Sequence, residues 1–460
     1  MKPLKILSRI GLVLLIVVAA VLLVRAILNF TEGRALARTL ADLKAKGIPV
    51  AAKDLAAPCA DEDNAARLWK AYENISPFPG RQPVGNGPGR HPSRNMAALE
   101  SLDRAWRDYK DGKLIAPADR AAMKKLILDN EEALRLVAEM AEKPCFLYRD
   151  PSQPLIESLP PNAVQMIRTT KLLFFSALFS AEDGDLSGAV TKVVVGQKIA
   201  TLSAREGTMM GCLVAMADAR MFCQFLGDLC RGRALGGADI RRLMDVQNPR
   251  AWREYMAAGI RSERVAFVEA GGYFTKGKLK DLGSVFETDW LENAGLWVIR
   301  PLVKKDVRQS LPAYEFLEAQ ARVPYYQSRD ALRAGYEQLK NRPWYAYASR
   351  AMIGDFEAAY MKVAQIEALM LSSRAGLACR LFKGQTGRYP DRLEELVPAL
   401  LPELPVDPFT GKPLVYRREG DGFIVYSLGS NQKDDGGRMT YEITQLVMDK
   451  DDDWSWREDR

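Results

Sequence analysis

The stretch DFEAAYMKVAQIEALMLSSRAGLACRLFK, residues 355–383, predicts a long helix near the carboxyl end of the chain. Its large apolar side chains recur at spacings of three, four and seven residues, the period of one helical face: Phe356, Tyr360, Val363, Ile366, Met370, Leu377 and Leu381. The segment GQTGRYP follows and holds Gly384, Gly387 and Pro390, which end the pattern.

Shorter elements are predicted after this helix. DRLEELVPALLPEL, residues 391–404, predicts a short second helix bounded by prolines, and DPFTGKP, residues 407–413, predicts a turn. Two alternating runs then indicate strands at Leu414–Tyr416 and Phe423–Tyr426. Between them, Asp421-Gly422 is a typical hairpin signal. The sequence therefore predicts a carboxyl-terminal α+β unit with a long helix and a small antiparallel sheet.

Taken in order, the long helix, TGRYP, the short helix, LPVDPFTGKPLVY, GFIVYSLG and an acidic Gly-rich loop resemble the carboxyl-terminal region of the major pseudopilin of type II secretion. The resemblance covers about Ala375–Arg457, under a fifth of the chain. It implies that the long helix packs on the sheet. It also implies a third strand from DDDWSWRE, residues 451–458, with Trp454 and Trp456 on one face.

The same resemblance implies a bound calcium ion, which takes 6–8 oxygen ligands in flexible geometry. Here an asparagine stands where the family has a ligating aspartate, and RMTYEITQLVMDK, residues 438–450, separates the two halves of the site. The alternative interpretation is a solvated acidic turn. The resulting candidate calcium ligands are Leu428 (through its carbonyl), Asn431, Asp434, Asp435, Asp452 and Asp453.

Two features of a pseudopilin are missing. Its membrane anchor continues directly into the long helix, whereas about 330 residues separate the apolar amino terminus from the sheet here. Gly11-Leu12 also does not match a prepilin-peptidase site. We therefore do not expect assembly into a pseudopilus. The overall plan, with an anchor, a helical middle and this tail, also resembles bacterial membrane-anchored proteins, a likeness that brings no activity with it.

The amino terminus, MKPLKILSRIGLVLLIVVAAVLLVRAILNF, has an uncharged run of 15 residues between Arg9 and Arg25. Because arginine side chains snorkel, the apolar span covers about residues 6–28, enough for a bilayer core of about 30 Å. The pattern predicts an uncleaved anchor, with a signal peptide cleaved after residues 18–20 as the alternative. Basic residues before the run favour a single-pass protein of the bacterial inner membrane, with its bulk in the periplasm.

The middle of the chain, residues 31–350, is predicted to be an α-helical domain broken by Pro/Gly clusters. Helices are expected over 118–141 and 163–181, and the acids of DEDN, residues 61–64, are typical of the first turn of another. The boundaries that follow are a membrane anchor at 1–30 and a pseudopilin-like domain at 351–460.

One helical hairpin is predicted at EDGDLSGA, residues 182–189, where Gly184 ends the first helix and Asp185 caps the second. This turn resembles a tetratricopeptide-type repeat, and an ordinary antiparallel helical pair is the alternative. Further on, residues 282–307 carry Trp290 and Trp297 beside two lysines. Such a helix either rests on a membrane surface or packs its tryptophans into a core.

Histidine and cysteine usage restrict the chemistry. The single histidine, His91, lies in a Gly/Pro-rich loop, so multi-histidine metal sites are excluded. Cys59 and Cys145 fall in proline-containing connections and can pair in an oxidising compartment. Three further cysteines, spaced by 11 and 7 residues, are expected on one helical face as small buried hydrophobes: Cys212, Cys223 and Cys230.

The composition is that of a folded protein, with 48% hydrophobic and 27% charged residues and a net charge of +7. No basic stripe interleaved with aromatics is present, so nucleic-acid binding is not predicted. The function predicted is that of an extracytoplasmic binding or scaffold protein for envelope components. The alternative is a secretion component that docks on pseudopilins. An envelope enzyme ranks last, because no pair of carboxylates stands at a defensible spacing.

Overall fold

A computed structural model gives the fold of the chain. The described residues are 2–55, 59–78, 96–158, 161–276, 290–343, 345–346, 349–350, 356–438 and 453–458. His91 and most of the Gly/Pro-rich loop around it lie outside these ranges, as do residues 282–289 of the predicted tryptophan-bearing helix.

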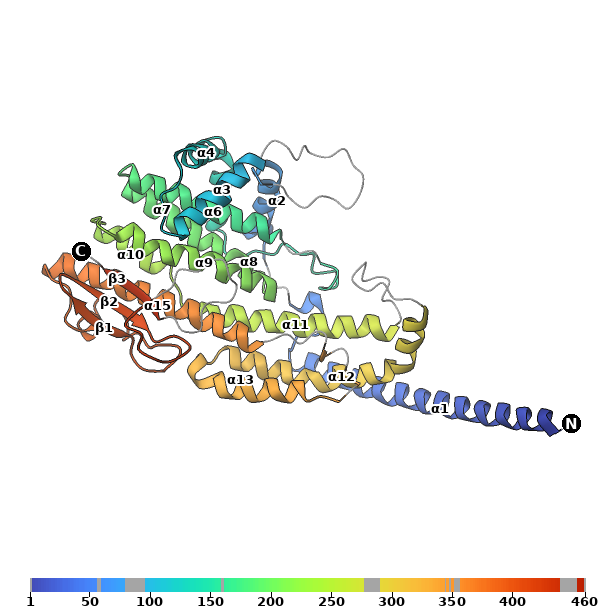
Figure 1. Cartoon of the computed structure of the whole chain (residues 1–460). Helices are drawn as coiled ribbons and strands as arrows, with labels where there is room; N and C mark the ends of the chain where they lie inside the picture. The colour runs from blue at the N-terminus through green and yellow to red at the C-terminus, as the bar shows by residue number, and fades with distance from the viewer. Residues whose placement is uncertain are drawn as a thin grey trace.

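The protein is mainly α-helical, as predicted, with one small antiparallel sheet near the carboxyl terminus (Figure 1). The first helices are α1 (Lys2–Ala45), α2 (Ala65–Ile75), α3 (Met96–Lys110), α4 (Pro117–Leu128), α5 (Glu131–Ala141), α6 (Ala163–Glu182), α7 (Leu186–Ala200) and α8 (Leu202–Arg205). They are followed by α9 (Met209–Cys230), α10 (Gly237–Asp245), α11 (Ala251–Lys276), α12 (Trp290–Ala321), α13 (Tyr325–Lys340) and α15 (Phe356–Thr386). The strands are β1 (Val415–Glu419), β2 (Gly422–Ser427) and β3 (Trp454–Glu458).

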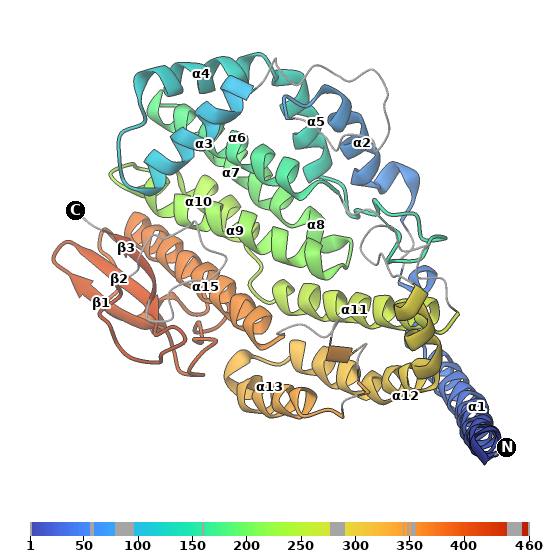
Figure 2. The ribbon, with the colours of Figure 1, turned by 45° about the vertical axis from the view of Figure 1, so that its right-hand side comes forward.

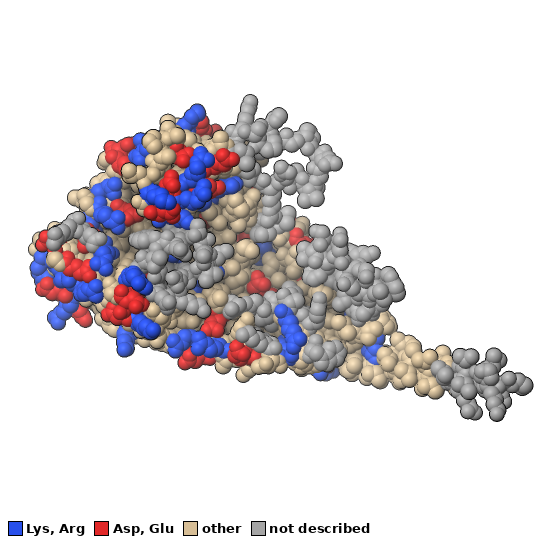
Figure 3. All heavy atoms as spheres, viewed as in Figure 1, with Lys and Arg blue, Asp and Glu red and all other residues tan. Residues whose placement is uncertain are grey.

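Helix α1 projects from the body at its amino end and packs on α12 further along (Figure 1). Its most apolar window, within Gly11–Ala45, has a mean hydropathy of 3.0 and is not buried at all. The projecting part shows mainly uncharged side chains, whereas both signs of charge are mixed over this face of the body (Figure 3). The helix is therefore long and apolar enough to serve as a single membrane anchor.

Helix α9 also has the length and hydropathy of a membrane span, but 72% of its apolar window is buried inside the body. It is a core helix, packed against α6, α7, α11 and α15. Cys212, Cys223 and Cys230 are all buried along it, as predicted for small apolar residues.

The predicted helical hairpin is formed by α6 and α7, which pack against each other. Gly184 has a φ of +90°, a conformation that glycine adopts without strain, and it follows the end of α6. Asp185 then caps α7 by accepting a hydrogen bond of 2.9 Å from the Gly188 backbone N–H. The turn chemistry that the sequence predicted is confirmed.

The sheet has the order β1-β2-β3, and both pairings are antiparallel. Helix α15 packs across β2 and β3, and it comes close because residue 376 is glycine: a Cβ there would stand 2.5 Å from the Trp456 ring. The predicted hairpin exists, but its turn is Gly420-Asp421, since Glu419 already pairs with Gly422. Gly420 has a φ of +56°, so it takes the turn position that disfavours a side chain.

Two of the predicted helices are wrong in extent. The helix expected over 118–141 is divided into α4 and α5, because Asn130 leaves the helical conformation and its side-chain amide donates to the Leu126 carbonyl at 2.7 Å. The short helix expected over 391–404 is only a 3₁₀ turn at Leu393–Leu396. Pro398 follows and has no backbone N–H to continue it.

The start of α2 also differs from the prediction. Asp61–Asp63 form a separate 3₁₀ turn and do not enter the first turn of the α-helix. Asn64 is the actual N-cap, since its side chain accepts from the Ala66 N–H at 3.0 Å. The amide of Asn64 also donates to the Leu147 carbonyl at 3.1 Å, so tertiary contacts decide where this helix begins.

Buried Asp218 on α9 makes stability depend on pH. It is 1% exposed, and burial raises the pKa of its carboxyl to about 8, far above the value of about 3.9 in an unfolded chain. Between these two pKa values the folded state binds more protons, so the free energy of unfolding falls as pH rises. We expect Asp218→Asn to remove this fall, so that the difference between variant and wild type grows from about pH 4 to about pH 8.

Urea denaturation of both proteins across this pH range is the measurement. Asp421→Asn is the control, because this side chain is exposed in the hairpin turn and its replacement should change the free energy of unfolding little. A pH-independent difference for Asp218→Asn as well would contradict a raised pKa.

Candidate functional site

The acidic loop, residues 428–438, follows β2 and contains four of the six predicted calcium ligands. Asp407, buried in the predicted DPFTGKP turn, fixes where this loop begins. One of its oxygens accepts from the Ser427 hydroxyl at 2.9 Å, and the other accepts from the Leu428 N–H at 3.0 Å. The buried carboxylate therefore joins the turn before the hairpin to the loop after it.

Asp453 returns to the acidic loop despite the long insertion that precedes it. It is completely buried, and its Oδ2 accepts from the backbone N–H groups of Asp435 at 3.1 Å and Gly437 at 2.7 Å. Its Oδ1 is buried and has no hydrogen-bond partner among the described residues. Burial, together with the nearby charges of Asp435 and Asp434, raises the pKa of Asp453 to about 6.

The other loop ligands are held by hydrogen bonds. Asp434 accepts from the Tyr426 hydroxyl at 2.7 Å and from the Gly436 N–H at 3.0 Å, and the Tyr426 bond lowers the pKa of this carboxyl. Asn431 donates to Asp435 Oδ2 at 2.9 Å, while its own oxygen accepts from the Lys433 N–H. The loop is thus held by hydrogen bonds among its own residues and to Tyr426.

Calcium binding at this loop stays a prediction. Within the described ranges, no three His, Cys, Asp or Glu side chains gather closely enough to form a metal-binding group. Asp452 lies outside those ranges. The orphaned Oδ1 of Asp453 fits a cation, because a buried carboxylate oxygen needs a partner and calcium accepts hard oxygen ligands.

A second polar region joins α1 to α12 where the projecting part of α1 ends. The Arg25 guanidinium lies 3.3 Å from the centre of the Trp297 ring, and its Nε donates to the Trp297 carbonyl at 3.1 Å. Lys304 Nζ donates to Asn29 at 2.7 Å. Burial, followed by the charges of Arg25 and Arg300, lowers the pKa of Lys304. Trp297 is 38% exposed, so it packs beside the anchor and not in the core.

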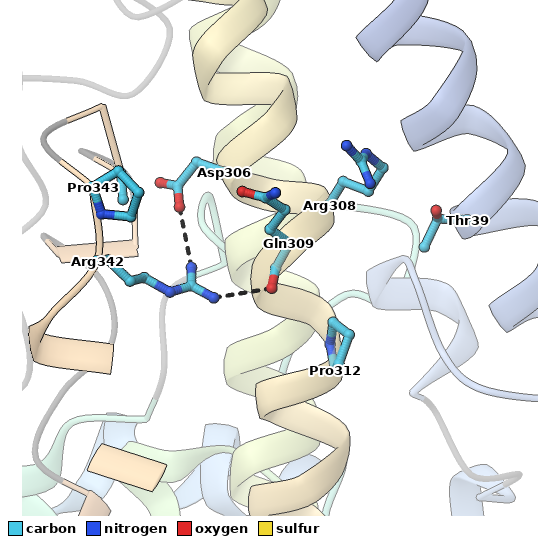
Figure 4. Close-up of a pocket in the computed structure, with 8 residues that line it drawn as sticks. Thr39, Asp306, Arg308, Gln309, Pro312, Arg342 and Pro343 are labelled. Carbon is cyan, nitrogen blue, oxygen red and sulfur yellow. Dashed lines mark hydrogen bonds and ion pairs between the residues drawn. The ribbon is translucent and has the colours of Figure 1, made fainter. Parts of the chain in front are cut away.

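A junction cavity of about 550 Å³ lies between α1, α12 and the segment after α13 (Figure 4). Arg308 on its α1 side pairs with Glu32 at 2.8 Å. On the other side Arg342 donates to Asp306 at 3.2 Å and to the Gln309 carbonyl at 2.9 Å (Figure 4). The cavity is lined by Thr39, Asp306, Arg308, Gln309, Pro312, Arg342, Pro343 and Ala346.

Both carboxylate oxygens of Asp306 accept hydrogen bonds from neighbouring residues. It is 1% exposed; Oδ1 accepts from Arg342 and from the Ser349 hydroxyl at 2.8 Å, and Oδ2 accepts from the Ser349 N–H at 2.8 Å. Both oxygens of this buried carboxylate therefore already accept hydrogen bonds from the protein itself. The arrangement suits a structural connection between α1 and the body.

Sequence reasoning missed this junction because its partners are far apart in the chain. Arg25 and Trp297 are separated by 272 residues, and Asp306 and Ser349 by 43. The only local signal was the position of tryptophans beside lysines at residues 290–305.

Comparisons with known protein families, with curated proteins and with solved structures returned no match.

The Asp306 network predicts a specific stability effect. Asp306→Ala leaves the partly buried Arg342 without its carboxylate and the Ser349 N–H without an acceptor, so we expect a loss of about 3–5 kcal/mol in the free energy of unfolding. Arg333→Ala is the matched control: its pair with Glu357 is 63% exposed on the arginine side and should contribute less than about 1 kcal/mol. Urea denaturation in detergent measures the free energy of unfolding of both variants. Equal losses would contradict a larger stabilising contribution from the Asp306 network.

Proposed function

We propose that the protein is a single-pass membrane-anchored protein of the bacterial inner membrane, whose periplasmic body binds or scaffolds other envelope components. The observation that carries this proposal is helix α1, which is exposed and apolar in its first half and packed on the body in its second half. Because one continuous helix does both, the body is held at a fixed distance from the bilayer.

The state of the cysteines supports a periplasmic location for the body. Cys59 and Cys145 form a disulfide that closes 86 residues, whereas the four remaining cysteines are buried thiols within the helical core. Disulfides persist in oxidising compartments such as the bacterial periplasm and are rare in the cytosol. The bridge fastens the segment before α2 to the segment after α5, which stabilises the body outside the membrane.

The polar chemistry favours binding over catalysis. In the junction cavity, the Asp306 carboxylate and the Arg342 guanidinium pair with each other and form an internal structural network. A rigid helical body with a fixed orientation is instead suited to presenting surfaces to partners.

The alternative proposal is a secretion component that docks on pseudopilins. Its support is the order of elements at the carboxyl end: the long helix α15, the hairpin β1–β2, the acidic loop and the returning strand β3. This sheet lies at the end of the body away from α1 in both views (Figures 1 and 2). Deletion of the protein should then block the export of specific proteins, and normal export in the deletion strain removes this alternative.

We also propose calcium as a structural ligand of the acidic loop, held by Asp453 Oδ1 with Asp434, Asp435, Asn431 and the Leu428 carbonyl. When bound, the ion supplies positive charge that offsets the repulsion between these carboxylates. Asp452 remains a candidate ligand by sequence.

The location is tested by thiol counting. In whole chains denatured without reductant, a maleimide-linked polymer should label four thiols, and after reduction it should label six. A carboxyl-terminal alkaline phosphatase fusion, which is active only in the periplasm, should be active. Labelling of six thiols without reductant, with an inactive fusion, contradicts a periplasmic body.

The calcium proposal is tested by thermal unfolding of the full chain with millimolar calcium or with a chelator. An ion that binds only to the folded state raises the midpoint temperature of unfolding, and we expect a rise of about 2 °C or more with calcium. Asp453→Asn should abolish the shift, and Asp421→Asn in the hairpin turn should leave it unchanged. The absence of a shift in the wild type would eliminate the site.

A further inference from the structure

A groove on the side of the body combines an apolar floor with a basic rim. Its volume is about 480 Å³, within the range of about 300–1,000 Å³ typical of small-molecule sites. Helix α9 forms the floor, with α3 and α6 on one side and α15 on the other, the arrangement visible in Figure 2.

The floor is apolar because the residues facing it are large hydrophobes around one small residue. Leu213, Met216 and Met221 of α9 and Ile366 and Leu369 of α15 line it. Ala217, in the middle of this part of α9, is exposed, so its small side chain leaves open space above the helix. Such a surface takes up a hydrocarbon chain, since each buried CH₂ group contributes about 0.8 kcal/mol.

The rim of the same groove carries five cationic side chains, from all four helices: Arg107, Lys110, Lys171, Arg220 and Lys362. Among the described residues, the acidic side chains that line it are Asp103 and Asp218. Asp103 pairs with Lys171 at 3.0 Å. Asp218 is 1% exposed and its Oδ1 has no hydrogen-bond partner within the described chain.

Asp218 does not offset the positive rim at neutral pH. Burial raises the pKa of its carboxyl to about 8, so this side chain is mostly protonated at pH 7. Among the described residues that line the groove, the one ionised carboxylate, Asp103, is already paired with Lys171, and Arg107 and Lys362 add positive charge to the rim. The groove therefore favours an anionic group beside an apolar chain.

We propose that this groove binds a single-chain amphiphile with an anionic head group, such as a long-chain fatty acid. The acyl chain lies along α9 and α15, and the carboxylate lies at the basic rim. The inference concerns the body alone and does not depend on where α1 places the protein. It adds a ligand class beyond the partner binding and the calcium ion proposed above.

The test uses the full chain in a nonionic detergent with a diazirine-bearing palmitate as the probe. After irradiation, mass spectrometry of the digested protein should find cross-links in peptides of α9 and α15 that line the groove. Unlabelled palmitate should compete for them, and hexadecanol, which has the chain without the charge, should compete at least about fivefold less well. Cross-links confined to α1, or equal competition by both compounds, overturn the proposal.

Ala217→Trp tests the floor, because an indole at this exposed position fills the groove without disturbing the core. We expect cross-linking of the groove peptides to fall by about tenfold or more. Met210→Trp is the matched control on the same helix: Met210 is 55% exposed and does not line the groove, so its cross-linking should match the wild type. Unchanged cross-linking in Ala217→Trp overturns the proposal.

Lys362→Glu tests the rim. Reversal of this charge should weaken competition by palmitate about fivefold and leave competition by hexadecanol unchanged. Lys412→Glu, at an exposed turn outside the groove, should change neither. An equal effect of Lys362→Glu on both compounds would show that charge plays no part in recognition.

Discussion

The burial of α15 is the constraint on which the rest of the structure depends. All residues from Val363 to Met370 are buried, which is more than two full turns, so this part of the helix is covered on every side except along the groove that Ile366 and Leu369 line. Helices α9 and α11 and the sheet each cover a part of α15. Both hydrophobic clusters of the body contain residues of α9 and α15. These two helices therefore join helices α2 to α7 to the sheet.

Burial of the helices also places polar side chains in the interior, and the hydrogen-bond partners of each side chain determine its role. Glu367 on α15 is 1% exposed and accepts two hydrogen bonds from Arg253 of α11, at 2.6 and 3.0 Å. Asp306 likewise accepts from Arg342, and it connects α12 to the segment after α13. Asp218 and Asp453 each keep one buried oxygen that has no partner in the part of the chain that the structure describes. An unpaired buried oxygen is costly, and these two carboxylates belong to the acidic loop and to the groove for which ligands are proposed above.

The local elements were largely predictable, because turns and caps are short-range chemistry. Gly184 and Asp185 predicted the α6–α7 turn, and the alternating runs predicted β1 and β2. The errors arose where a side chain far away or a backbone detail decided the outcome. Asn130 breaks a helix that its neighbours favour, and Asn64 caps α2 while it is held by Leu147. The acidic loop was predicted by residue type, but the return of Asp453 to it depends on the pairing of β3 with β2.

The sequence by itself determined the apolar amino-terminal helix, the helical character, the hairpin and the acidic loop, because each follows from the order of neighbouring residues. Only the tertiary structure decided which faces of α15 are buried, since the apolar period of that helix defined one face and its neighbours cover the others. It also brought Arg25 onto Trp297, closed the disulfide, and assembled a basic rim from four helices. These features combine residues from distant parts of the chain, and their positions follow from how the helices pack against one another.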